Sequence, residues 1–234
     1  MALDRIVQWI YWKRGQRANR PLRFGDFRRV VPMSRAFGFE RGRPVDRYYI
    51  ENFLEEWSGD IHGRVLEVGD NRYTLQYGGD RVTQSDVINL TPDNPHATIV
   101  ADLTQADQTI ASNTFDCFIF TQTLQFIYDL RPAVQSIYRI LTPGGVLLAS
   151  FPVISQICRY DMDRWGDYWR FTSASIQRLL EEVFSPEGVL VSAHGNVLAA
   201  MCFMHGLAAE DLKTEELNFW DPDYQIVITA RAVK

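Results

Sequence analysis

The sequence predicts an α/β fold: a mostly parallel, seven-stranded Rossmann-like sheet with helices on both faces, an antiparallel last strand and a basic N-terminal arm. Two observations predict it. From residue 63 onward, short apolar runs typical of strands alternate with segments of helical periodicity. One of the runs, FDCFIFT (115–121), has the apolar centre of a strand that is covered on both faces. Such alternation favours a parallel sheet between two layers of helices.

The expected elements follow one another along the chain. Strands are expected over 64–69, 81–89, 96–103, 115–121, 146–151, 189–193 and 224–232. Helices are expected over 3–12, 48–57, 131–141, 172–184 and 197–207. Asp46 is the expected N-cap of the second helix, and Thr172 or Ser173 that of the fourth. The third ends at the Thr142-Pro143-Gly144-Gly145 breaker.

Charge divides the chain into two parts. Residues 1–47 contain 12 basic and 4 acidic residues (+8), and residues 48–234 contain 12 and 25 (−13), which together give −5. We therefore expect a basic arm or lid over 1–47 and one domain over 48–234. The arm either packs on the acidic body of its own or a neighbouring chain, which would allow an oligomer, or contacts an anionic substrate or surface. A nucleic acid partner is disfavoured, because the acidic body would repel its phosphates.

Several classes of protein are disfavoured by composition. No run of 18 apolar residues suggests a membrane span. Asp4 and Arg5 interrupt the apolar start, which makes it a poor signal peptide. The three widely spaced cysteines, Cys117, Cys158 and Cys202, fit neither a disulfide framework nor a metal site. We therefore expect a cytoplasmic protein without a bound metal.

Acidic residues accompany the ends of three successive predicted strands. Glu67 lies two residues before Gly69, and a carboxylate there suits a ligand with cationic ammonium and sulfonium groups better than a pyrophosphate. Asp86, near the end of the second strand, can accept from both hydroxyls of a ribose. Asp102, at the end of the third, can accept from an adenine amino group. Parallel strands bring these ends to one edge of the sheet.

These motifs resemble the class I S-adenosylmethionine-dependent methyltransferases over about residues 60–185. The resemblance rests on VLEVGD (65–70), IVADLT (99–104) and YRILTPGGVLLASFP (138–152), together with the segments around residues 115–129 and 168–172. It implies S-adenosyl-L-methionine as cofactor. It also implies a binding set, in which the first residues lie by the methionine moiety: Glu67, Gly69, Asp70, Asp86, Asp102, Leu103, Thr121 and Gln122. An N-terminal stretch, RGRPVDRYYIE (41–51), is similar to bacterial methyltransferases found among carbohydrate-modifying enzymes, and implies that Asp46, Tyr48 and Tyr49 lie near the site.

Two side chains are candidates for a general base. His194 directly follows the sixth predicted strand, although a histidine there can equally be satisfied by the backbone. Asp161 lies in CRYDMDRWGDYWRF (158–171), whose carboxylates and aromatic rings suit a sugar or aromatic acceptor, or pack as a lid. No Asn/Asp-Pro-Pro-Tyr motif follows the fourth strand, where TQTL stands, which favours an oxygen acceptor over a nucleobase or glutamine nitrogen. We expect O-methylation of a small-molecule, sugar or nucleotide-sugar hydroxyl.

Two other functions compete with this hypothesis. A nicotinamide-dependent oxidoreductase would carry G-x-G-x-x-G after the first strand, where this chain has only Gly69. The same missing glycines leave open a catalytically silent domain of methyltransferase fold that serves as a binding partner or scaffold. Cofactor turnover separates the enzyme from the scaffold.

Overall fold

The structure is a computed structural model that describes residues 23–106 and 109–234. The helix expected over 3–12 therefore lies outside the described residues. The chain forms two compact units, Met1–Pro32 and Met33–Lys234. The described part of the first contains a short 3-10 helix, Gly25–Phe27. Everything below concerns the second unit.

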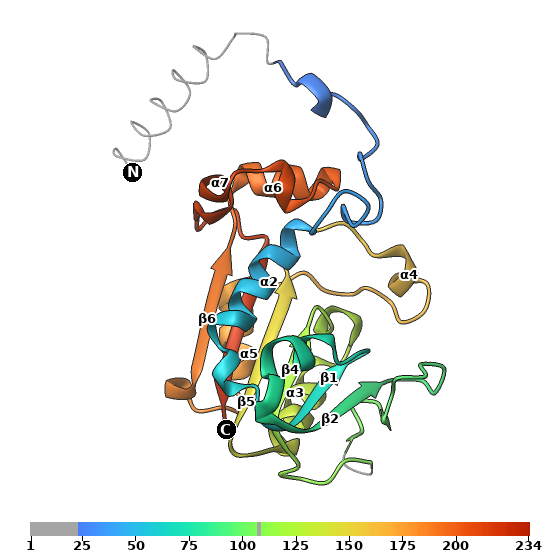
Figure 1. Cartoon of the computed structure of the whole chain (residues 1–234), viewed down its shortest axis with the longest axis vertical. Coiled ribbons are helices and arrows are strands. Elements are labelled where there is room, and N and C mark those ends of the chain that lie inside the picture. Colours follow the sequence, from blue (N-terminus) through green and yellow to red (C-terminus); the bar gives the residue numbers. More distant parts are fainter. Residues whose placement is uncertain (1–22, 107–108) are drawn as a thin grey trace, which may run out of the picture. The chain divides into compact units, whose positions relative to one another are not determined.

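The second unit is built on a seven-stranded sheet in the order β3-β2-β1-β4-β5-β7-β6 (Figure 1). β7 is antiparallel to both of its neighbours, and the other neighbouring pairs are parallel. This topology confirms the predicted fold class. The strands are β1 (Gly63–Val68), β2 (Val82–Asn89), β3 (Ile99–Val100), β4 (Phe115–Thr121), β5 (Leu141–Pro152), β6 (Val189–His194) and β7 (Val227–Val233).

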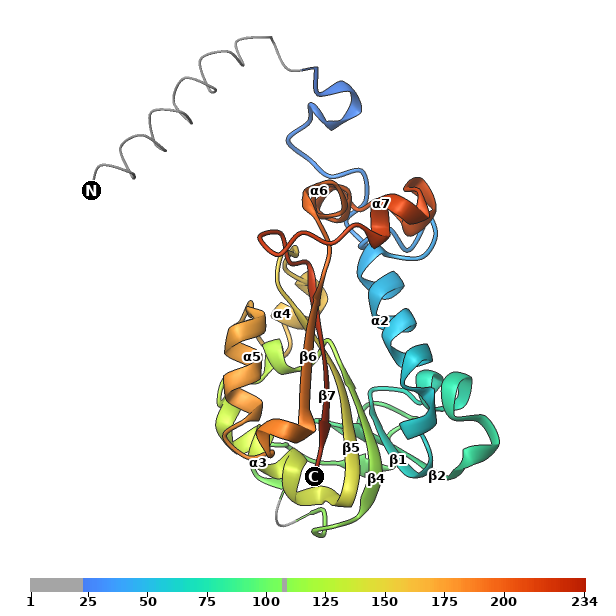
Figure 2. The ribbon, with the colours of Figure 1, turned by 90° about the vertical axis from the view of Figure 1, so that its left-hand side faces the viewer.

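Helices cover both faces of the sheet. Figure 2 shows α3 and α5 on one face and α2 on the other. The α-helices are α2 (Val45–Glu56), α3 (Leu130–Ile140), α4 (Arg159–Met162), α5 (Ser173–Leu180), α6 (Val197–His205) and α7 (Thr214–Asn218). After β1, where a longer helix is common in this architecture, the chain makes only a π-helical turn, Thr74–Gly78.

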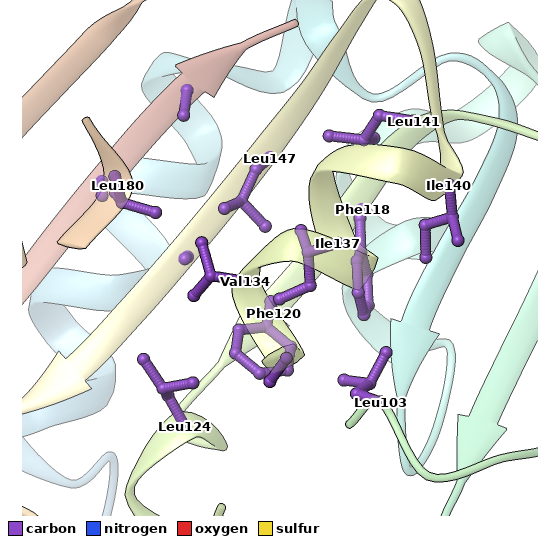
Figure 3. Close-up of a cluster of buried hydrophobic side chains, with 14 of the residues drawn as sticks. Leu103, Phe118, Phe120, Leu124, Val134, Ile137, Ile140, Leu141, Leu147 and Leu180 are labelled. Atoms are coloured by element: carbon purple, nitrogen blue, oxygen red, sulfur yellow. The ribbon is translucent and has the colours of Figure 1, made fainter. Parts of the chain in front are cut away.

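Alternate residues of β4 supply two hydrophobic cores. Phe118 and Phe120 point to the α3 and α5 side, whereas Cys117 and Ile119 join the core beneath α2. In Figure 3 the phenyl rings lie against Ile137 of α3. The apolar run of β4 is thus explained by burial on both faces, as its composition predicted.

Some predicted boundaries and caps were wrong. β3 contains only Ile99 and Val100, because this edge strand pairs only with the last two residues of β2. Asp46 is not an N-cap: α2 begins after Pro44, and the Asp46 carboxylate accepts from the N–H of Arg47 at 2.8 Å within the first turn. Thr172 does cap α5, accepting from the N–H of Ser175.

Candidate functional site

Two neighbouring cavities lie at the edge of the sheet where the parallel strands end. The larger, of about 410 Å³, is bordered by Val68 at the end of β1, Asn89 at the end of β2 and Asp102 after β3. The loop after β4 and the segment 158–171 close it. Its size and position are those of a ligand site in an open α/β sheet. The remaining lining residues are Ile88, Leu90, Ala101, Leu103, Thr104, Thr123, Phe126, Ile127, Tyr128, Asp129, Asp161, Trp165 and Tyr168.

The smaller cavity, of about 220 Å³, lies between α2, the loop after β4 and the segment 158–171. Asp46 and Arg47 come from α2, and Gln122 and Gln125 from the loop. Phenylalanine rings and the first residue of β7 supply apolar walls. Asp161 and Phe126 line both cavities, so a ligand in one lies next to a ligand in the other.

The loop after β1 has the glycine conformation that the motif predicts. Gly69 has a φ of +79°, and a Cβ there would meet no atom within 4 Å, so the backbone is open to a ligand. The Glu67 carboxylate is not exposed to that space: it accepts from the N–H groups of Tyr73 and Thr74 (3.1 and 2.7 Å) and from the Thr74 hydroxyl (2.7 Å). Burial raises the pKa of Glu67 to about 7. Glu67 therefore holds the loop, and the structure gives it no ligand-facing oxygen.

Asp86 is in the middle of β2, and the structure does not bring it to the strand end where a ribose was expected. Its side chain is buried and saturated: Oδ2 accepts from Arg64 Nε (2.8 Å) and Gln84 Nε2 (3.0 Å), and Oδ1 from Thr98 Oγ1 (3.0 Å). β2 extends three residues further, so Asn89 stands at the strand end. Asn89 lines the larger cavity and lies twenty residues after Gly69, the spacing of a ribose-binding residue in related sheets.

The other predicted cofactor residues divide between the two cavities and the surrounding loops. Asp102 and Leu103 line the larger cavity, as expected for the base-binding end of the site. Gln122 lines the smaller one. Thr121 and Asp70 line neither, and the Asp70 carboxylate accepts from the N–H of Arg72 at 3.0 Å.

The segment 158–171 is fixed to the loop after β4. The N–H of Tyr168 donates to the carbonyl of Gln125 (2.8 Å), and Trp169 Nε1 donates to the carbonyl of Ile127 (3.1 Å). Arg170 pairs with Asp167 and leaves that carboxylate almost fully covered. These contacts place α4, and with it Asp161, over the boundary of the two cavities.

His194, the other predicted base, lines neither of these two cavities. Its ring stacks on Tyr49 at 5.6 Å, and Nε2 lies 2.8 Å from the Thr229 hydroxyl. It borders a separate depression with Trp220. Burial lowers its pKa to about 4, because a charged imidazole would be desolvated there. The ring packs α2 onto β6 and β7.

The low pKa predicts a pH effect on stability. The unfolded chain binds a proton at His194 near pH 6.5, whereas the folded chain resists it down to about pH 4. The unfolded state therefore gains protons first, and stability falls as pH drops through this window. Compared with His194→Gln, the wild type should lose on the order of 2 kcal/mol more unfolding free energy between pH 7.5 and pH 4.

Urea unfolding at a series of pH values measures this difference. The comparison with the variant cancels the opposite slope from Glu67, whose raised pKa makes stability fall as pH rises from 4.5 to about 7. If the unfolding free energy of the wild type and of His194→Gln fell equally between pH 7.5 and pH 4, the lowered pKa of His194 would be contradicted. Methyl transfer by His194→Gln should be unimpaired.

Three of the site residues, Asn89, Arg47 and Gln125, were not expected from the sequence. Arg47 lies within a motif that the resemblance quoted, but only Asp46, Tyr48 and Tyr49 were expected near the site. Asp46 does line the smaller cavity, whereas Tyr48 and Tyr49 donate to Asn218 Oδ1 (2.7 Å) and the Leu217 carbonyl (2.9 Å) and hold α7. Gln125 gave no signal beyond its place after the fourth strand.

The described residues contain neither a candidate metal cluster nor a helix that could span a membrane. Between residues 23 and 234, leaving out 107–108, no group of three or more His, Cys, Asp and Glu side chains could hold a metal ion. Over the same described part of the chain, no helix has both the length and the apolar character to cross a membrane.

Known proteins resemble this chain both in one stretch of sequence and in fold. Residues 54–149 match the family described as a methyltransferase domain. A SAM-dependent methyltransferase from Archaeoglobus fulgidus superposes with a TM-score of 0.55 and 12% identity, over 86% of this chain and all of that one. The N-methyltransferase NodS from Bradyrhizobium japonicum WM9, in complex with S-adenosyl-L-homocysteine, superposes with a TM-score of 0.54 and 15% identity. The superposition covers 87% of this chain and 94% of that one. The fold is that of the class I S-adenosylmethionine-dependent methyltransferases.

The similarity also extends to curated relatives. The ubiquinone/menaquinone biosynthesis C-methyltransferase UbiE of Klebsiella pneumoniae (strain 342) is 29% identical over 117 residues, which cover 41% of this chain and 47% of that protein. The match therefore spans about half the length of the curated relative. Residues 54–149 of this chain are thus similar to a methyltransferase domain, the fold is that of S-adenosylmethionine-dependent methyltransferases, and S-adenosyl-L-methionine is the cofactor that these similarities indicate.

Proposed function

We propose that this chain is an S-adenosylmethionine-dependent methyltransferase that acts on a hydroxyl group of a small molecule, a sugar hydroxyl foremost. One observation carries the proposal: Asp161 lines both cavities at once. A carboxylate at the boundary between a donor site and an acceptor site is placed to take a proton from the group that is methylated.

The larger cavity suits the cofactor. Asp102 can accept from an adenine amino group and Asn89 can bond to a ribose, while Leu103 and Ile127 offer apolar contact to the base. Gly69 leaves the backbone open beside Val68, where the chain enters the cavity. Bound S-adenosylmethionine would supply a methyl group on a positively charged sulfur, which becomes a neutral thioether when the acceptor oxygen takes the methyl.

The chain's own residues do the remaining work. The acceptor would occupy the smaller cavity, with phenylalanine rings against its apolar face and its hydroxyl at the boundary. Asp161 accepts the hydroxyl proton as the oxygen–carbon bond forms. The segment 158–171 covers both ligands and excludes water, so that orientation and shielding supply much of the rate. An oxygen acceptor accounts for a carboxylate base at this position.

Calorimetry with S-adenosyl-L-homocysteine, the reaction product, tests the cofactor site without knowledge of the acceptor. We expect a dissociation constant of about 100 μM or tighter, roughly −5.5 kcal/mol. Asp102→Asn should weaken binding, whereas Asp80→Asn, the same change at an exposed position before β2, should not. Transfer of a labelled methyl group to a panel of sugars and other hydroxyl compounds tests the reaction. Tight binding without turnover on any of them would favour the silent scaffold domain.

A further inference from the structure

The smaller cavity contains a cationic side chain that the fold leaves without an ionic partner. Arg47, in the first turn of α2, lines the cavity, and its Nε is buried with no hydrogen bond. Across the part of the chain that the structure describes, its guanidinium makes no salt bridge, whereas Arg170 in the same cavity pairs with Asp167. Burial disfavours the charge of this half-buried residue, while the nearby Asp46, Tyr73 and Glu51 raise the pKa of Arg47 without forming a salt bridge to it, so an anionic ligand would supply the missing ionic contact.

The neighbouring acidic groups do not fill this role. The Asp46 carboxylate is buried and accepts from the backbone N–H of Arg47, not from its guanidinium. Glu51, one turn further along α2, pairs with Arg43 at 3.4 Å. The buried Tyr73 hydroxyl lies close enough to Arg47 to raise the pKa of that arginine, although the two groups do not form a hydrogen bond of ideal geometry. The corner of the cavity around Arg47 is therefore polar and incompletely bonded.

A second donor on the same cavity is held in a strained conformation. Gln122 has a φ of +47°, a region that costs a residue with a Cβ about 1 kcal/mol or more. Its N–H donates to the Ser150 carbonyl (2.9 Å), and Gln125 Nε2 donates to its carbonyl (2.8 Å), so the surrounding structure enforces this geometry. Its side-chain Nε2 is buried with no partner. A strained backbone and an unpaired buried amide in a residue that lines a cavity are typical of a ligand site.

We propose that Arg47 and Gln122 bind a carboxylate group in the smaller cavity. A guanidinium and an amide together offer the donors that the two oxygens of a carboxylate require, and the charge of the guanidinium is then compensated. The inference rests on the proposed function, because it concerns the ligands of that same site. The carboxylate belongs either to the amino-acid end of the cofactor, reaching from the larger cavity, or to the acceptor.

Calorimetry with two related ligands separates these sources. S-Adenosyl-L-homocysteine has the carboxylate, and 5′-methylthioadenosine lacks the amino-acid end. If the cofactor supplies the carboxylate, Arg47→Met should weaken the first by roughly tenfold or more and leave the second unchanged. Gln122→Ala should show the same pattern more weakly. Arg43→Met, which removes a partly buried arginine outside both cavities, is the control and should change neither.

The acceptor arm uses protein saturated with S-adenosyl-L-homocysteine. If the acceptor supplies the carboxylate, 4-hydroxybenzoate should raise the melting temperature of the wild type but not of Arg47→Met, and methyl 4-hydroxybenzoate should raise neither. Circular dichroism checks folding of each variant. If Arg47→Met does not fold, Arg47→Lys, which keeps the charge and loses the planar fork, should show a smaller loss with the same ligand selectivity.

Two results would overturn the inference. Equal affinity of wild type and Arg47→Met for S-adenosyl-L-homocysteine, together with no Arg47-dependent response to 4-hydroxybenzoate, would make Arg47 a structural residue. Failure of the wild type to bind either nucleoside would refute the proposed cofactor site instead. In that case the cofactor source is excluded, and the 4-hydroxybenzoate comparison on the free protein decides the remaining one.

Discussion

Asp161→Asn is expected to lower the rate constant of methyl transfer by about 10²- to 10⁴-fold, the usual contribution of a positioned general base. The asparagine amide has nearly the same shape as the carboxylate, but it cannot accept the hydroxyl proton. Affinity for S-adenosyl-L-homocysteine should change little, because Asp161 is one of many residues that line the larger cavity. Single-turnover kinetics with labelled cofactor measure the rate, and calorimetry measures the affinity.

Asp163→Asn is the matched control. Asp163 lies just past the end of α4, is exposed, pairs with Arg159 at 3.4 Å and lines neither cavity. A surface ion pair of this kind contributes little, so this variant should keep wild-type activity. Equal rates for Asp161→Asn and the wild type would show that Asp161 takes no proton, and equal losses in both variants would point to the stability of the segment 158–171.

Asp86→Ala is expected to destabilise the fold by about 2–3 kcal/mol and to leave the cofactor site intact. The change removes one partner of a largely buried pair and leaves the guanidinium of Arg64 uncompensated beneath the sheet edge. It also removes the acceptor of the Thr98 hydroxyl, which helps join β3 to β2. The estimate is below that for a fully buried pair, because Arg64 is partly exposed.

Urea unfolding measures the loss of stability, and calorimetry with S-adenosyl-L-homocysteine measures whether the cofactor site is intact. Both are done well below the melting temperature. Asp86→Asn retains a side-chain acceptor for Gln84 or Thr98 and should lose less stability than the alanine variant. A variant of unchanged stability that no longer binds S-adenosyl-L-homocysteine would restore Asp86 as a ribose-binding residue and remove Asn89 from that position.

The fold could be predicted from sequence because its determinants are periodic. β4 reads as a strand buried on both faces, and the Thr-Pro-Gly-Gly breaker ends α3 where expected. The second strand was also found, with its end at Asn89, but the ribose was assigned to Asp86, three residues before that end. Three residues along a strand separate the ligand edge from the interior of the sheet. Asn89 therefore lies at the ligand edge, and Asp86 lies within the sheet.

The site was harder to predict because residue type does not reveal what a side chain already contacts. Glu67 and His194 have the chemistry for their expected roles, but both already have partners. Backbone N–H groups of the loop donate to the Glu67 carboxylate. The His194 ring stacks on Tyr49 and contacts the Thr229 hydroxyl. Arg47 and Gln122 are candidates for the opposite reason, because Arg47 Nε and Gln122 Nε2 are buried without a hydrogen-bond partner. Only the three-dimensional arrangement distinguishes these cases.

The order of the strands also affects synthesis of the chain. β6 has no neighbour in the sheet except β7, and β7 follows it only after α6, α7 and their connections. At about 5–20 residues per second, a ribosome exposes β6 for a few seconds before its partner exists. During that interval β5 lacks one of its two neighbours and β6 lacks its only one. A nascent-chain chaperone or a pause in translation near codon 195 would therefore act on this half of the sheet more than on β1–β4.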